Sequence, residues 1–119
     1  MTQEDKNLLL KDLSARLPYQ VVVSYKNSDT GEAYNQILDP MVYSLVQYIP
    51  NVGGLVIKPY LRPRESITKK ELKEYNKIFN KSLDAWEFAD WMNAHHFDYR
   101  GLIEKGLALE APKGMYTEK

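Results

Sequence analysis

The stretch "LRPRESITKKELKEYNKIF", residues 61–79, contains the clearest local structural pattern in the chain. Thr68 lies three residues before Glu71, the spacing of a capping box, in which each side chain bonds to the backbone amide of the other residue. Ile67 and Leu72 occupy the positions of the hydrophobic staple that often accompanies such a helix start. The pattern predicts that a helix begins directly after Thr68.

This predicted helix is amphipathic, as a helix that packs on a core should be. Its apolar side chains, on one side, are Leu72, Tyr75, Ile78 and Phe79. Its charged side chains, largely on the other side, are Lys69, Lys70, Lys73, Glu74 and Lys77. Another helix is predicted to follow, capped by Asn80 or Ser82 and ending near His95 or His96. Its apolar residues are Leu83, Trp86, Phe88, Trp91 and Met92.

The residues between the N-terminal segment and this stretch have the composition of short β-strands. The segments "YQVVVSY", "AYNQIL", "VYSLVQYI" and "GLVIKPYL" are short and rich in Val, Ile, Tyr and Leu. They are separated by "KNSDTGE", "DP" and "PNVGG", which are typical turn sequences. We therefore predict a small antiparallel sheet, either open or curled into an SH3-like barrel.

The N-terminal segment, residues 3–17, predicts a helix. Its leucines recur four residues apart, at Leu9, Leu13 and Leu17. Thr2 lies three residues before Asp5, which again resembles a capping box. Pro18 ends the helix, because the residue before a proline is pushed out of the α region.

Together these patterns predict an α+β fold. A chain of 119 residues and 13.8 kDa fits one domain with a single core. The predicted domain, residues 1–119, divides into a helix (1–17), a small β-sheet (18–61), a helical region with the C-terminal helices (62–111) and a tail (112–119).

Composition excludes several classes of function. The formal net charge is zero, with 16 basic and 16 acidic residues, so no global field attracts nucleic acid or anionic lipid. The chain has no Cys, which excludes disulfides, thiolate zinc sites and cysteine nucleophiles. We find no secretory signal and no apolar run of about 20 residues, so the expectation is a cytoplasmic protein without a membrane span.

The segment "WMNAHHFDYRGL" places several side chains that can act in catalysis or bind a ligand close to His95 and His96. Asp98 is a good N-cap and Gly106 fits a left-handed helix end, so residues 98–105 are predicted to form a two-turn helix after a tight corner. Side chains of adjacent helical residues point about 100° apart, which is a poor arrangement for a metal. We predict a helix end that binds no metal. A general base oriented by Asp98, and a helix-turn-helix that binds DNA, are the alternatives.

The basic segment "IKPYLRPRESITKK" is the other candidate site. Its cations are Lys58, Arg62, Arg64, Lys69 and Lys70. Basic and aromatic residues on the rim of a small barrel can bind single-stranded nucleic acid. Alternatively, the segment is an extended connector whose arginines are solvated, because five cations alone give a weak phosphate footprint.

Nine Tyr and two Trp in a short chain favour an interaction surface, since these residues are common anchors at interfaces. We find no complete catalytic constellation and no motif for a cofactor. The sequence therefore predicts a non-enzymatic intracellular interaction or accessory protein with an unidentified protein partner and no cofactor. The alternative is a weak nucleic-acid-binding module that uses the region from Lys58 to Lys70.

Three segments, "LLLKDLSARLPY", "IKPYLRP" followed by "SIT", and "HHFDYRGLIEKGLALEAP", resemble an uncharacterised family of small proteins from gut bacteria and their mobile elements or phages. The resemblance covers both ends of the chain and the junction between the predicted sheet and helix. It implies an intracellular accessory protein and assigns no role to any residue.

Overall fold

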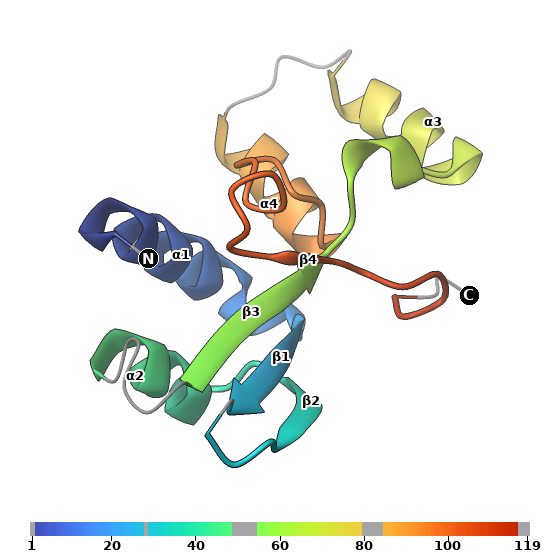
Figure 1. The fold of residues 1–119 in the computed structure, drawn as a ribbon. Coiled ribbons are helices and arrows are strands. Elements are labelled where there is room, and N and C mark those ends of the chain that lie inside the picture. The colour runs from blue at the N-terminus through green and yellow to red at the C-terminus, as the bar shows by residue number, and fades with distance from the viewer. Residues whose placement is uncertain (1, 28, 49–54, 80–84, 117–119) are drawn as a thin grey trace.

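The computed structural model describes residues 2–27, 29–48, 55–79 and 85–116 (Figure 1). Its helices are α1 (Gln3–Arg16), α2 (Pro40–Tyr48), α3 (Lys69–Phe79) and α4 (Ala85–Ala94), with short 3-10 helices η1 (Leu17–Tyr19) and η2 (Arg64–Ser66). Its strands are β1 (Val22–Asn27), β2 (Ala33–Ile37), β3 (Leu55–Leu61) and β4 (Leu109–Glu110). The predicted α+β fold with an N-terminal helix is confirmed. Among the described residues, no helix has the length and apolar character needed to cross a membrane.

The four strands form one open sheet in the order β2-β1-β3-β4. β1 is antiparallel to both of its neighbours, whereas β4 is parallel to β3. The sheet does not close, so it is not the SH3-like barrel that was one of the two predicted forms. β4 lies within residues 62–111, which were predicted to be helical. There Leu109 pairs with Tyr60, so this region also contributes a strand to the sheet.

The predicted strand "VYSLVQYI" is wrong, because residues 40–48 form α2. Asp39 caps this helix: its Oδ1 accepts a hydrogen bond from the amide of Val42 at 2.9 Å. Pro40 occupies the first helical position, where its missing N–H costs nothing. Val42 and Val46, four residues apart, are both buried on one face of the helix. The pair Asp39 and Pro40 is therefore a helix start and not a turn between strands.

The main core lies between the sheet and the two helices α1 and α2, which lie on the same side of the sheet in Figure 1. Its buried side chains include Leu9, Leu13, Val23, Val42, Val46, Ile57, Leu61, Leu102 and Leu107. A second, smaller cluster contains Trp91, Met92 and Phe97. The candidate site described below adjoins this second cluster.

Residues 98–105 contain no helix: the chain is irregular up to Gly101 and forms turns from Leu102 onward, so the predicted two-turn helix is wrong. Asp98 is not the predicted N-cap of such a helix: its carboxylate accepts hydrogen bonds from the amides of Leu102 at 2.9 Å and Ile103 at 3.0 Å, four and five residues on, where an N-cap would bond two or three residues on. Gly101 has a φ of +75°, in the left-handed region. A right-handed helix cannot continue through a residue in that conformation, so the chain forms turns after it.

The predicted closure of this segment at Gly106 is confirmed. Gly106 has a φ of +74°. The amide of Leu107 donates to the carbonyl of Leu102 at 2.9 Å, and the amide of Gly106 donates to the carbonyl of Ile103 at 3.1 Å. These two bonds define a Schellman motif, and the accompanying apolar residues Leu102 and Leu107 are both buried in the main core.

Both predicted capping boxes are confirmed. The Thr2 hydroxyl accepts from the amide of Asp5 at 3.0 Å, and the Asp5 carboxylate accepts from the amide of Thr2 at 3.4 Å. The Thr68 hydroxyl accepts from the amide of Glu71 at 3.1 Å, and the Glu71 carboxylate accepts from the amide of Thr68 at 3.0 Å. Local spacing therefore fixes where α1 and α3 begin.

The apolar contact at the start of α3 differs from the predicted staple. Leu72 is 45% exposed, whereas Ile67 packs against the cluster of Trp91, Met92 and Phe97. Ile67 thus connects the start of α3 to the end of α4.

Replacing Thr68 by Ala is expected to lower the free energy of unfolding by about 1 kcal/mol, because the amide of Glu71 loses its hydrogen-bond partner. Thr68→Ser keeps a hydroxyl and should cost much less. Chemical denaturation of the wild type and the two variants measures the difference. Equal stability of the Ala and Ser variants would show that Thr68 does not cap α3.

Candidate functional site

The candidate site lies where the end of β3, the start of α3 and the end of α4 meet. It has two adjoining parts. The first is a polar junction formed by Arg62, Glu71 and His95. The second is an aromatic pocket beside that junction.

Arg62 directly follows β3, and its backbone joins β3 to the segment after α4. Its amide donates to the carbonyl of His96 at 2.7 Å, and its carbonyl accepts from the amide of Asp98 at 2.9 Å. Its guanidinium lies over the ring of Phe97, 4.2 Å from the centroid. Two of its nitrogens donate to the two carboxylate oxygens of Glu71, each at 2.7 Å. This bidentate geometry is a strong form of charge-assisted hydrogen bond.

Glu71 is at once the capping residue of α3 and the anion of the junction. Burial by itself would raise the pKa of its carboxyl group. Hydrogen bonds from Arg62 and Thr68, together with the positive charge of Arg62, outweigh burial and lower that pKa from 4.5 to about 2. Glu71 is therefore a carboxylate at neutral pH and a poor general base, since general bases work best with a pKa near the working pH.

His95 completes the junction from the end of α4. Its Nδ1 lies 3.1 Å from Oε2 of Glu71, and its Nε2 lies 3.6 Å from Oε1 of Glu74. Its ring lies against the indole of Trp91, with the centroids 4.3 Å apart. The Trp91 Nε1 in turn donates to Glu74 at 3.0 Å. The junction thus binds α3 and α4 together through both carboxylates.

His96 closes α4, as predicted for a histidine at a helix end. Its φ is +64°, and its amide donates to the carbonyl of Asn93 at 3.1 Å, while the amide of Phe97 donates to the carbonyl of Met92 at 3.0 Å. This is a second Schellman motif, with His96 at the position that glycine usually occupies. The described residues contain no group of three or more His, Asp or Glu side chains that could hold a metal.

The side chain of His96 faces the C-terminal segment. Its ring stacks on Tyr116 with the centroids 3.9 Å apart. Burial, and then the nearby charges of Arg16 and Arg62, lower the pKa of His96 from 6.5 to about 4. The Tyr116 hydroxyl accepts from the amide of Val22 at 2.8 Å and donates to the carbonyl of Tyr60 at 2.7 Å. His96 and Tyr116 thus attach the C-terminal segment to β1 and β3.

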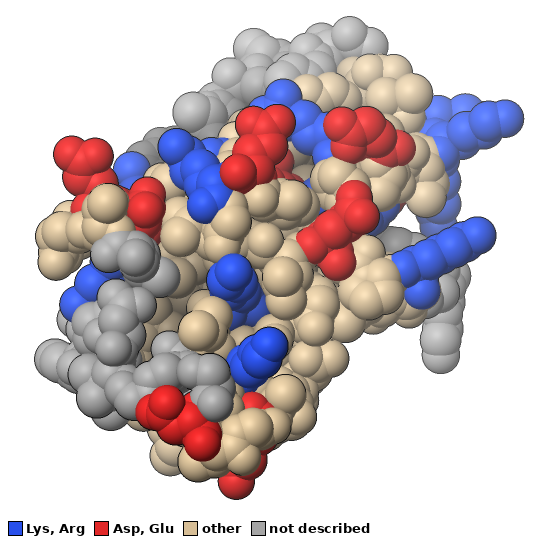
Figure 2. Space-filling model, viewed as in Figure 1, with Lys and Arg blue, Asp and Glu red and all other residues tan. Residues whose placement is uncertain are grey.

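The five residues predicted to contact nucleic acid differ in their surroundings and in how available they are to a ligand. Lys58 lies within β3, opposite Ser24 of β1. The side chain of Arg62 is only 11% exposed and is paired with Glu71. Arg64, Lys69 and Lys70 are exposed. On the face shown in Figure 2, basic and acidic side chains are interspersed and do not form a patch of one sign. Nucleic-acid binding by this segment stays a prediction, and Arg62 is the member least available for it.

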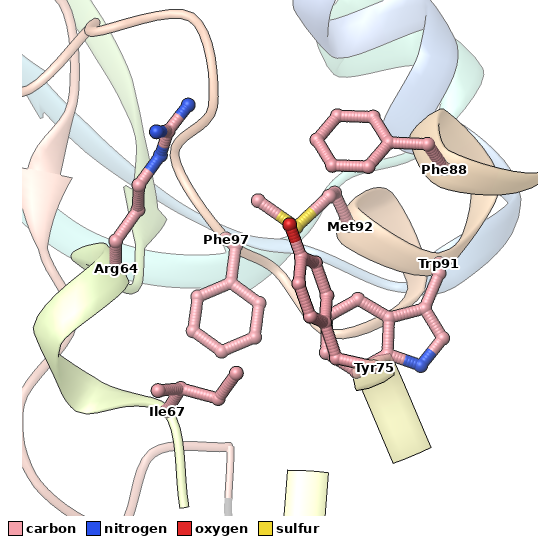
Figure 3. Close-up of a pocket in the computed structure, with 7 residues that line it drawn as sticks. All are labelled: Arg64, Ile67, Tyr75, Phe88, Trp91, Met92 and Phe97. Atoms are coloured by element: carbon pink, nitrogen blue, oxygen red, sulfur yellow. The ribbon is translucent and has the colours of Figure 1, made fainter. Parts of the chain in front are cut away.

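The aromatic pocket has a volume of about 150 Å³. It is lined by Arg64, Ile67, Tyr75, Phe88, Trp91, Met92 and Phe97. In Figure 3, Arg64, Ile67 and Phe97 lie on one side of the space, and Phe88, Met92, Trp91 and Tyr75 lie on the other. Edge-to-face contacts fix the second wall: the rings of Tyr75 and Trp91 are 5.5 Å apart, and those of Tyr75 and Phe88 are 6.5 Å apart.

Among the residues that the structure describes, Arg64 is the only charged side chain that lines the pocket. It is exposed on η2, and its guanidinium makes no hydrogen bond or ion pair with any other residue that the structure describes, although the Arg64 carbonyl accepts from the amide of Ile67. In Figure 3 its aliphatic part follows the wall of the pocket and its guanidinium lies at one end. The pocket therefore offers apolar surface together with one cation whose donors are available to a ligand.

Sequence reasoning missed this pocket. The Tyr and Trp residues were predicted to favour an interaction surface, but no pattern indicated that Tyr75 and Trp91 lie together around one pocket. Arg64 was considered only as a phosphate contact or a solvated cation. The pocket forms because η2, α3 and α4 meet at an angle that no local spacing encodes, so the sequence contains no pattern that would have located it.

Comparison of the chain with known protein families, with curated proteins and with solved structures finds no match. The resemblance to a family of small proteins from gut bacteria and phages stays a prediction.

Proposed function

We propose that this protein is an intracellular interaction protein without enzymatic activity, and that it binds a partner by taking one large apolar side chain into the aromatic pocket. The observation that carries this proposal is the pocket itself: about 150 Å³ of space, lined by six apolar or aromatic residues and Arg64. A cavity of roughly 150 Å³ is large enough for one benzene ring. The pocket therefore fits the side chain of Phe, Leu or Met.

The lining residues have the composition of an interface. Aromatic residues, Met and Arg are enriched at protein interfaces, and Trp, Tyr and Arg most often supply the binding energy. Tyr75 and Phe88 are partly exposed and Trp91 is buried. The pocket is present in the single chain, so it is formed without a partner. A preformed pocket lowers the ordering cost of binding.

The exposed guanidinium of Arg64 indicates the chemistry beside the apolar group. An arginine binds a carboxylate in a bidentate manner when its donors are available. The partner we propose is a peptide segment that places an Asp or Glu next to the inserted apolar residue.

The polar groups near the pocket support a role in binding over one in catalysis. Glu71 is occupied by Arg62, Thr68 and His95. Both oxygens of Asp98 accept bonds from backbone amides. These groups hold the backbone in place, and such positioning is what a rigid binding site requires.

A random peptide library selected against the wild-type protein is expected to yield sequences in which Phe, Leu, Met or Trp adjoins Asp or Glu. Fluorescence anisotropy then measures the affinity of one selected peptide for the variants. Ile67→Trp fills the pocket and should weaken binding at least about tenfold, because the displaced anchor carries most of the binding energy. Arg64→Gln should weaken it about three- to tenfold and should make it less sensitive to salt.

Lys73→Gln is the matched control, because Lys73 is an exposed cation on α3 that does not line the pocket. Its affinity for the peptide should equal that of the wild type. Selected peptides without an apolar residue, or unchanged binding by Ile67→Trp, would contradict the proposal. A single-stranded oligonucleotide that binds at low salt, and that loses affinity when Arg64, Lys69 and Lys70 are replaced by Ala, would favour the nucleic-acid alternative.

A further inference from the structure

β2 is an edge of the sheet. Among the described residues it pairs with β1 alone, and β1 lies between β2 and β3. Four of its five residues are exposed, and the fifth, Gln36, is partly exposed. Tyr34 and Ile37 are 48% and 52% exposed, which is unusual for such large apolar side chains on a strand.

The hydrogen bonds of β1 and β2 show which backbone groups of β2 remain available. At one end of the pair the amide of Asn27 donates to the carbonyl of Glu32 at 2.8 Å, and at the other end the amide of Leu38 donates to the carbonyl of Val21 at 2.8 Å. Bonded residues alternate along an antiparallel strand. The backbone groups of Ala33, Asn35 and Ile37 therefore point away from β1.

This edge lacks the features that usually prevent strands from pairing. Edge strands are commonly protected by Lys, Pro, bulges or inward-pointing charges. β2 reads Ala33-Tyr34-Asn35-Gln36-Ile37 and contains no charged residue and no proline. Its register with β1 is continuous from Val22 opposite Ile37 to Lys26 opposite Ala33, without a bulge.

We propose that β2 is a self-association surface, which pairs antiparallel with β2 of a second copy of this chain about a two-fold axis at Asn35. In this register Asn35 faces Asn35, and Ala33 faces Ile37 of the second copy. All three outward-facing residues then exchange their backbone hydrogen bonds, and the two sheets become continuous.

The side chains of β2 complement themselves in this register. Each Asn35 amide has both donors and an acceptor, so two of them can bond to each other across the axis. The small Ala33 leaves room for Ile37, whose exposed apolar surface becomes covered. The chain has zero net charge and β2 has none, so electrostatic repulsion does not oppose a second copy. None of the residues that line the aromatic pocket belongs to β2, so this inference is independent of the proposed function.

Sedimentation equilibrium tests the inference with charged substitutions at the axis. The wild type is expected to change from monomer to dimer between about 10 µM and about 1 mM, since one strand pair buries less surface than a permanent dimer does. Asn35→Lys alone and Asn35→Glu alone should each weaken association at least about tenfold, because like charges face each other across the axis. An equimolar mixture of the two variants should restore a dimer with one copy of each.

Ser44→Lys is the matched control, because it adds the same charge at an exposed position of α2. It should associate like the wild type. Restoration by mixing also shows that both Asn35 variants are folded. A wild type that remains monomeric at about 1 mM would overturn the inference. Dimerisation of the Lys variant alone, or a mixture that remains monomeric, would overturn it as well.

Discussion

Replacing Arg16 by Met is expected to lower the free energy of unfolding by about 3–5 kcal/mol, the usual cost of breaking a buried ion pair by removing one partner. The side chains of Arg16 and Asp12 are both 0% exposed, and Nε of Arg16 lies 2.7 Å from Oδ2 of Asp12. Arg16 also donates to the carbonyl of Phe97 at 2.6 Å. The substitution leaves a buried carboxylate with Arg100, at 3.1 Å, as its remaining cation.

Chemical denaturation measures this loss, with Lys11→Met as the control on the exposed side of α1, where a change of less than about 0.5 kcal/mol is expected. Combining Arg16→Met with Asp12→Leu should recover part of the loss, because no unpaired carboxylate remains. If Arg16→Met is as stable as Lys11→Met, the ion pair contributes nothing to holding α1 against the segment after α4.

Local patterns correctly located the starts of α1 and α3 and the closure at Gly106. The predicted caps of the next helix, Asn80 or Ser82, lie outside the described residues. The boxes at Thr2 and Thr68 and the closure at Gly106 depend on residues within one or two turns of each other. Such contacts are encoded by spacing alone, which is why a single sequence is enough to locate them.

Two errors have different physical origins. The "DP" before α2 was interpreted as a turn, although Asp followed by Pro is also the sequence of a helix start, so the local information was present and misassigned. The segment after Asp98 was predicted as a helix, but Gly101 has a φ of +75°, and the turns that follow it place Leu102 and Leu107 in the core. That packing cannot be deduced from spacing.

The polar groups of the site were predicted only in part. Arg16 was not singled out, although it is fully buried and joins α1 to Phe97. Arg62 was considered a nucleic-acid contact, because nothing in the spacing of Arg62 and Glu71 indicates that they pair. Ion pairs across nine or more residues depend on how the elements dock, so they become visible only in the structure.

The ion pair of Arg62 and Glu71 also links stability to the proposed binding site. It connects the end of β3 to the start of α3, and His95 extends the connection to α4. These are the elements that carry the two walls of the aromatic pocket. A change that breaks the junction should therefore loosen the pocket as well as the fold.

Replacing Glu71 by Gln is expected to lower the free energy of unfolding at pH 7 by about 3 kcal/mol, because Arg62 loses its anion and the depressed pKa of Glu71 no longer stabilises the folded state. In the folded wild type the pKa of Glu71 is about 2, whereas the ordinary pKa of a glutamate side chain, which applies to the unfolded chain, is 4.5. The unfolded chain therefore binds more protons between these values, so the contribution of Glu71 is complete above pH 4.5 and is lost as the pH falls toward 2.

Denaturation at a series of pH values separates this effect from others. The difference in stability between wild type and Glu71→Gln should shrink steadily as the pH falls from 4.5 to 2. Glu65→Gln, at an exposed position of η2, should follow the wild type throughout. His96 supplies an internal reference. Its pKa is about 4 in the folded protein, whereas the ordinary value for histidine is 6.5, so the stability of the fold decreases as the pH drops from 6.5 to 4. Glu71→Gln should show the same decrease over that pH range, because it leaves His96 in place. Parallel curves for wild type and Glu71→Gln below pH 4.5 would contradict the role of Glu71 as the paired anion of the junction, since a carboxylate that is not stabilised in the folded state produces no such difference.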